Sequence, residues 1–252
     1  MKSEFLFFLF CIITVQLAAQ DVNIEEYEID KKLNPATTPV SGFFDTGISF
    51  ALPQPELQKA VDNNVGGLGF GFSAGFGVNP FGKKRSSLLL VGLDFTYHTY
   101  GRDKIEGNNV SPPLKTTFNQ YLILPSIRVY APFQFSQKFF LEANGGLQVF
   151  SARTKIDKTA FDTLNDEQPE LINSENDTGL AYGVFIGTHS RRAKVSDLLQ
   201  ASFQVKAGYF TGETLRYVKR GSVQVDADGF INYETGYTQP AMFVIQLGVI
   251  LH

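Results

Sequence analysis

Five ionisable residues stand apart because they occur within long apolar segments, where a charged side chain is costly unless it has a partner. They are Asp45, Asp94, Arg128, Glu142 and Lys206. Carboxylates placed beside Arg and Lys could form a network of buried ion pairs, line a path for a solute, or supply a catalytic carboxylate. We predict a structural ion network, with the solute path and the catalytic carboxylate as alternatives.

Other residues with catalytic or metal-binding chemistry are few. Of the three histidines, His98 and His189 fall near opposite ends of the expected strands, too far apart to share a metal ion, and His252 is terminal. A hydrolase or acyltransferase would need His98 with Asp94 and a serine from another strand. Cys11 is the one cysteine and lies in a segment that we expect to be removed. We therefore predict no enzyme activity, no cofactor and no metal site.

Two short motifs resemble ligand sites without their context. Residues 69–74 match the dinucleotide-binding string G-x-G-x-x-G/A, but no helix follows to receive a pyrophosphate. Residues 226–229 resemble part of a calcium loop whose other ligand positions are missing. We interpret the first as a strand and Asp228-Gly229 as the turn of a hairpin, flanked by residues 223–225 and 230–233.

The amino terminus is typical of an exported protein. Met1 and Lys2 precede an apolar run at residues 5–13, and small residues follow before Gln20. This predicts a signal peptide over residues 1–19, cleaved after Ala19, since the run is too short to span a membrane comfortably. Residues 20–40 hold five acids and two lysines and end in prolines, so we expect a periplasmic acidic linker.

From residue 42 onward, apolar residues recur at every second position, which is the pattern of strands with one apolar face. The chain has 24 Phe and 23 Gly among 252 residues, as suits strands and tight turns. The predicted strands are longer than those usual in soluble proteins and match the length that crosses a bilayer. They cover residues 42–51, 66–78, 87–100, 117–131, 138–151, 179–190, 198–213 and 239–251.

The links between these strands alternate in length, at about 14, 8, 16, 6, 27, 7 and 25 residues. Short periplasmic turns and long surface loops alternate in this way in membrane barrels. We predict an all-β fold, a transmembrane antiparallel up-and-down barrel of eight strands over residues 41–252, with both termini on the short-turn side. A soluble β-sandwich is the alternative, but it has no reason to alternate its loops.

The period-two phase also predicts which side chains face the barrel interior. The five ionisable residues fall inward, and so do Gly67, Gly69, Gly71, Gly75 and Gly77, opposite large apolar residues. The short turn after residue 131 sets the register of the hairpin and places Arg128 across from Glu142. We predict an ion pair between these two residues.

Two segments resemble a known family. They are residues 121–130, a strand with an internal proline (Pro125), and residues 139–150, which carry the pair Gly145-Gly146. Together they resemble the PorT-like outer-membrane β-barrel family of Gram-negative bacteria. The resemblance implies an OmpA-like, eight-stranded barrel and implies little about activity. The chain ends in Leu251-His252 rather than in the aromatic residue usual for such barrels.

Charge limits the choice of partners. The formal net charge is −3, which argues against a nucleic-acid partner. Residues 152–178 are acidic and are expected to form a solvated loop, while the turns at 79–86 and 191–197 are basic. We expect contact with outer-membrane lipid and with an envelope or secretion-machinery protein. The hypothesis is a structural or interaction role in the cell envelope of a Gram-negative bacterium, with a narrow solute conduit and a lipid-modifying enzyme as alternatives.

Overall fold

The structure is a computed structural model, and it describes the greater part of the chain beyond residue 41. The predicted signal peptide (1–19), the predicted linker (20–40), the predicted turn at Asp228-Gly229 and His252 lie outside the described residues. The described residues are 42–61, 67–81, 88–105, 113–131, 138–156, 171–190, 193–194, 200–225 and 231–251.

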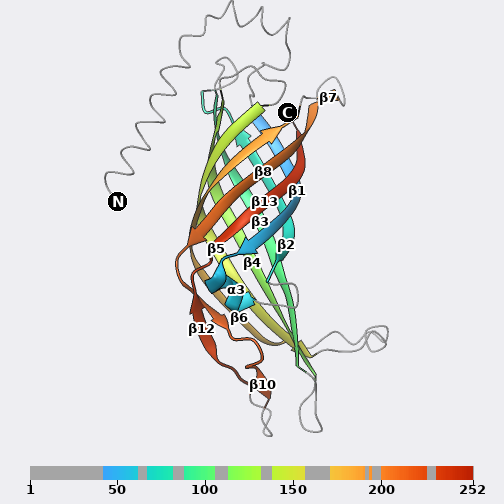
Figure 1. The fold of residues 1–252 in the computed structure, drawn as a ribbon, viewed down its shortest axis with the longest axis vertical. Helices are drawn as coiled ribbons and strands as arrows, with labels where there is room; N and C mark the ends of the chain where they lie inside the picture. The colour runs from blue at the N-terminus through green and yellow to red at the C-terminus, as the bar shows by residue number, and fades with distance from the viewer. Residues whose placement is uncertain are drawn as a thin grey trace, which may run out of the picture.

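Eight long strands in the described part of the chain form one closed antiparallel barrel (Figure 1). Each strand pairs with the next in chain order, and the last strand pairs with both the seventh long strand and the first. This confirms the predicted eight-stranded barrel, and every predicted strand overlaps an observed one. The strands are β1 (Gly42–Pro53), β2 (Gly69–Val78), β3 (Leu89–Ile105), β4 (Leu114–Tyr130), β5 (Lys138–Ile156), β6 (Leu171–His189), β8 (Gln200–Gly212) and β13 (Met242–Leu251).

The strands β3 to β6 are longer than the sequence predicted. Parts of residues 101–116 and 152–178, expected to be loops, continue the four strands at the long-link end of the barrel. The prediction ended each strand where the apolar alternation stopped. Beyond that point polar residues occupy most positions on both faces, so the alternation is lost although the backbone pairing continues.

Shorter elements complete the long-link end. The helix α3 (Pro55–Val61) starts at a proline, a residue favoured in the first helical turn, and buries Leu57, Ala60 and Val61. The sequence does not reveal this helix, because seven residues are too few to show a helical period. Among the described residues, no helix is long and apolar enough to cross a membrane.

The segment between β8 and β13 forms a ribbon of short strands. β9 (Leu215–Val218) pairs with β12 (Thr235–Thr238), and β10 (Gln224–Val225) pairs with β11 (Ile231–Asn232). The second pairing joins residues 224–225 to 231–232 antiparallel, as the predicted hairpin requires. One further short strand, β7 (Ala193–Lys194), pairs with β8 at the short-turn end.

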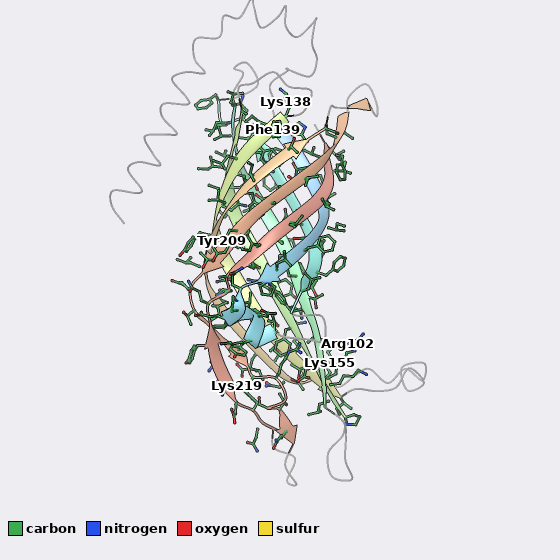
Figure 2. All side chains as sticks on the ribbon, viewed as in Figure 1. Arg102, Lys138, Phe139, Lys155, Tyr209 and Lys219 are labelled. Carbon is green, nitrogen blue, oxygen red and sulfur yellow. The ribbon has the colours of Figure 1, made fainter. Side chains whose placement is uncertain are left out.

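The outer surface of the barrel is apolar. Ile123 is 47% exposed and Leu147 is 50% exposed, so they do not pack in a central core. Phe139 and Tyr209 also lie on this surface (Figure 2). A soluble monomer rarely exposes so large a continuous apolar surface. Further members are Phe44, Ile48, Phe70, Phe72, Phe76, Leu141, Leu180, Val184, Ile186, Phe203, Phe243, Ile245 and Val249.

Candidate functional site

The five ionisable residues singled out in the sequence all lie inside the barrel. Asp45 comes from β1, Asp94 from β3, Arg128 from β4, Glu142 from β5 and Lys206 from β8, and each is at most 4% exposed. They are brought together across the barrel from five strands, because strand alternation turns each of them toward the axis. We call this group the charged layer.

Arg128 joins three side chains of the interior. Its Nε donates to Oε2 of Glu142 at 2.6 Å, and its Nη2 donates to Oδ2 of Asp45 at 2.9 Å. Its Nη1 donates to Oε1 of Gln204 at 3.3 Å. Arg128 and Glu142 are direct partners in the β4–β5 register, as the length of the connecting turn predicted. The predicted ion pair is therefore present.

Lys206 connects the other side of the charged layer. Its Nζ donates to Oε1 of Glu142 at 3.0 Å and to Oδ1 of Asp94 at 3.3 Å. Glu142 thus uses one carboxylate oxygen for each cation. The layer holds three carboxylates and two cations, and the amide groups of Gln204 and Asn144 donate to Asp45 and Asp94. Each of the five charges thus has at least one partner of opposite sign.

A glycine on β2 makes room for the two aspartates. Gly75 is the register partner of Asp45 on one side and of Asp94 on the other. A Cβ atom at Gly75 would stand 2.6 Å from Oδ1 of Asp94 and 2.8 Å from Oδ1 of Asp45. Neither carboxylate could keep its position, so the inward glycine is part of the charged layer.

Aromatic rings border the charged layer toward the short-turn end. The guanidinium carbon of Arg128 lies 3.9 Å from the ring centre of Phe43 and 4.2 Å from that of Phe140. Such contacts stabilise a desolvated cation. The two rings belong to an apolar cluster completed by Leu90, Tyr130 and Ile250, which fills the barrel at this end.

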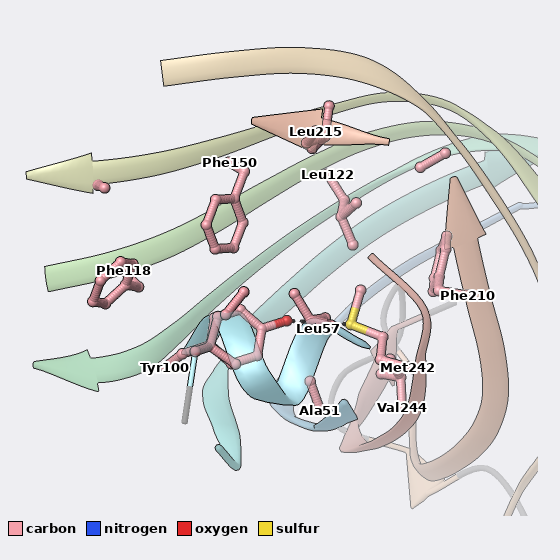
Figure 3. Packing of buried hydrophobic residues seen from close by; sticks show 14 of the residues in the cluster. Ala51, Leu57, Tyr100, Phe118, Leu122, Phe150, Phe210, Leu215, Met242 and Val244 are labelled. Atoms are coloured by element: carbon pink, nitrogen blue, oxygen red, sulfur yellow. Dashed lines mark hydrogen bonds between the residues drawn. The ribbon is translucent and has the colours of Figure 1, made fainter. Parts of the chain in front are cut away.

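A larger apolar cluster fills the barrel toward the long-link end (Figure 3). Leu57 of α3 lies among Tyr100, Met242 and Ala51, and all of these side chains are at most 1% exposed. The hydroxyl of Tyr100 donates to Oε1 of Gln120 at 2.6 Å and contacts Sδ of Met242 at 3.3 Å. The interior therefore has three layers, of which the charged layer is the middle one.

The uncharged members of the interior were not predicted from the sequence. Gln204, Asn144 and the pair Phe43 and Phe140 complete the charged layer, and α3 completes the outer apolar layer. The one feature of the sequence that could have identified them is their position on the inward face in the period-two pattern. That position is shared by every second residue, so it does not identify those that touch a charge.

The structure brings one serine to His98 but no carboxylate. His98 Nε2 lies 2.8 Å from Oγ of Ser49, while Nδ1 has no hydrogen-bond partner. Asp94 instead binds Lys206 and Asn144. His189 packs edge-on against Tyr130 at the short-turn end, apart from His98. Within the described ranges, no group of three or more His, Cys, Asp or Glu residues could hold a metal ion.

The exposed ribbon carries a separate set of polar contacts. Arg216 Nη2 binds Glu175 at 3.2 Å, and Lys219 Nζ binds Glu234 at 3.0 Å. The hydroxyl of Tyr233 also donates to Glu175, and this hydrogen bond raises the pKa of Tyr233. The two contacts of Glu175 attach the ribbon to the inner face of β6, and the Lys219–Glu234 pair lies within the ribbon.

Comparison with known proteins finds no matching family model and no curated relative. Three solved structures are similar over 84% of this chain. Neisserial surface protein A is 14% identical with a TM-score of 0.40 and 96% of its chain covered. Ail, the attachment invasion locus protein of Yersinia pestis, solved with the heparin analogue sucrose octasulfate, is 14% identical with a TM-score of 0.43 and 97% covered. A major outer membrane protein from Thermus thermophilus is 11% identical with a TM-score of 0.46 and 98% covered. The barrel assignment rests on the strand pairing of this chain itself.

Proposed function

We propose that this protein spans the outer membrane of a Gram-negative bacterium as a closed, filled barrel and serves as a structural or interaction component of the cell envelope. The observation that carries the proposal is the inversion of polarity, with charged residues at the axis and apolar residues on the outer surface. In water the exposed apolar surface would be unfavourable, whereas in a bilayer it contacts hydrocarbon while the charged residues pair with one another inside the barrel.

Aromatic pairs on the outer surface support the membrane placement. Tyr97 and Tyr121 are register partners with ring centres 5.2 Å apart, and Tyr209 lies 5.2 Å from Phe243. Tyrosine is enriched at membrane interfaces, where its ring contacts lipid and its hydroxyl contacts water. Export would follow from the predicted signal peptide, with cleavage after Ala19, and the PorT-like resemblance of residues 121–150 suggests the family.

The filled interior favours an envelope role over a solute conduit. An eight-stranded barrel is just wide enough for its own inward side chains. Here the two apolar clusters lie on either side of the charged layer, so an ion would have to cross two apolar barriers. The partner proposed for such a protein is a component of the envelope or of a secretion machinery, which would contact the exposed ribbon or the periplasmic turns.

Reconstitution tests both parts of the proposal. We expect the purified mature chain to require detergent or lipid and to insert into vesicles in a folded form, whose electrophoretic mobility changes when the sample is heated. In planar bilayers it should show no stable conductance steps. A Glu142→Gln variant should be equally silent. Solubility without amphiphiles would refute the membrane placement, and stable steps that change in Glu142→Gln would instead establish transport. A pull-down from native envelope in mild detergent, analysed by mass spectrometry, would identify the partner.

A further inference from the structure

Four strands continue beyond the barrel wall at the long-link end. β2 pairs with β3 only as far as Thr99, and β6 pairs with β8 only from Ala181 onward. Past these points β3, β4, β5 and β6 still pair with one another, up to the level where Leu114 faces Ile156. They form a projecting four-stranded sheet with one outer and one inner face (Figure 1).

The outer face of the projecting sheet is basic. Arg102 is the register partner of Thr117, which is the partner of Arg153. Two residues further along, Lys104 is opposite Lys115, which is opposite Lys155. Five cationic side chains from three neighbouring strands thus share one small surface, on which Figure 2 labels Arg102 and Lys155. We call it the basic face.

A bulge in β3 places Arg102 and Lys104 on the outer face. The β3–β4 register shifts between Thr99 and Arg102, where Gly101 has a positive φ of 84°. Only glycine adopts this conformation readily, and an added residue reverses the alternation of the strand. Tyr100 therefore points inward before the bulge and Arg102 points outward after it.

Nothing in the described part of the chain neutralises most of the basic face. Arg102, Lys115, Arg153 and Lys155 form no ion pair with any described residue. Among the described residues, the nearby acids Asp103, Glu175 and Asp177 lie on the opposite, inner face and accept hydrogen bonds from the ribbon. Asp103 accepts from the backbone N of Gly221, Asp177 from that of Arg216, and Glu175 from Tyr233.

The cross-strand lysines are unfavourable for the barrel alone. Like charges directly opposite each other in a sheet are destabilising. Here Lys115 of β4 and Lys155 of β5 are direct register partners. An anion bound to this face would remove that repulsion.

The basic face lies at a fixed height above the apolar belt. The outward face of β4 carries Lys115, Thr117 and Tyr121 in succession. Tyr121 belongs to the outer-surface pair with Tyr97, which we call the tyrosine rim. With a rise of about 3.3 Å per residue and a tilt of about 40°, Thr117 lies about 10 Å and Lys115 about 15 Å beyond the tyrosine rim. This is the zone just outside the hydrocarbon, on the lipid-facing side of the barrel.

We propose that the basic face binds the phosphate groups of lipopolysaccharide, the phosphorylated glycolipid of the outer leaflet. This inference rests on the proposed function, because only an outer-membrane barrel with its long links outside presents this face to that lipid. Charge complementarity and continuity with the apolar belt support it, since acyl chains would contact the belt while the phosphates contact the cations.

The test compares two triple variants in nanodiscs of phosphatidylcholine, which has no net charge. The first is Lys115→Gln/Arg153→Gln/Lys155→Gln. The matched control, Lys59→Gln/Arg216→Gln/Lys219→Gln, removes the same charge from exposed positions of α3 and the ribbon. The probes are rough lipopolysaccharide, the same preparation after phosphatase treatment, and polyglutamate as an acidic peptide.

We expect the unaltered chain to bind phosphorylated lipopolysaccharide and to lose most of this binding after phosphatase treatment. Each removed cation should weaken binding about five-fold, so the first variant should bind about a hundred-fold more weakly. The control variant should change binding less than about three-fold.

Three results would overturn the inference: equal binding of the phosphatase-treated lipid, equal loss in both variants, or tighter binding of polyglutamate than of lipopolysaccharide. Membrane insertion, on which the proposed function depends, is measured separately in the same nanodisc samples by the change in electrophoretic mobility on heating. A chain that inserts and folds but does not bind refutes only the lipid site. A chain that does not insert refutes the membrane placement.

Discussion

Replacement of Arg128 by Met tests whether the charged layer holds the barrel together. Met approximates the length and volume of the arginine stem, so the change removes the guanidinium without leaving a large cavity. The guanidinium binds Glu142 at 2.6 Å, Asp45 at 2.9 Å and Gln204 at 3.3 Å. After its removal three buried carboxylates share one cation, Lys206.

We expect Arg128→Met to lower the free energy of unfolding by about 3–5 kcal/mol, the usual effect of leaving a buried charge without its partner. The assay is urea unfolding of the barrel in lipid vesicles, followed by the electrophoretic difference between folded and unfolded chains. Arg216→Met is the matched control, because Arg216 forms an ion pair while 48% exposed, and it should change stability by less than about 1 kcal/mol.

A double variant separates loss of charge from loss of packing. Asp45 has Arg128 as its ion-pair partner, and the two side chains are 2.9 Å apart. Asp45→Asn combined with Arg128→Met removes one charge of each sign, so the double variant should be more stable than the sum of the single effects predicts, by about 0.5–3 kcal/mol. Additive effects, or a loss below about 1 kcal/mol in Arg128→Met, would refute the argument that buried ion pairs stabilise this interior.

Three further predictions concern space, lipid contact and chemistry. Gly75→Ala should destabilise the barrel by about 1–3 kcal/mol because its Cβ would stand 2.6 Å from an oxygen of Asp94, whereas the control Gly145→Ala, with its nearest atom 4.0 Å away, should be neutral in the same unfolding assay. Leu147→Arg should cost about 2–4 kcal/mol of stability in vesicles, since Leu147 faces lipid, and Leu147→Met should have little effect; equal stability of both variants would contradict the membrane orientation. His98→Ala should leave the lipid A of the host unchanged by mass spectrometry, because the His98–Ser49 contact lacks a carboxylate partner; a changed lipid A profile would support the enzyme hypothesis.

The local pattern was sufficient to predict most of the fold. Strict alternation placed Phe140, Glu142 and Phe150 on one face of β5 and Phe139 and Leu147 on the other, as observed. The alternation of short and long links predicted the closed meander. The Arg128–Glu142 pair followed from the same two facts, because a short turn determines the register of a hairpin.

Contacts between strands distant in the sequence could not be predicted in this way. Lys206 reaches Asp94 across 112 residues, and Gln204 reaches Asp45 across 159 residues, because barrel closure sets which inward positions share a level. The packing of Leu57 and of the ribbon residues in the larger apolar cluster also depends on closure of the barrel. The helix α3 has no surface to pack against until the strands have formed the end of the barrel.

By itself the sequence determined the number, order and facing of the strands, because side-chain alternation and turn length act over a few residues. Only the tertiary structure decided which charges meet and which side of β3 is basic. A single bulge at Gly101 shifts Arg102 and Lys104 out of the inward phase of His98 and Tyr100 and onto the outer face. The register of three strands then places them beside Lys115, Arg153 and Lys155. A bulge is recognised only when two residues of one strand lie opposite a single residue of the neighbouring strand. The alternation of side chains along one strand therefore cannot reveal it.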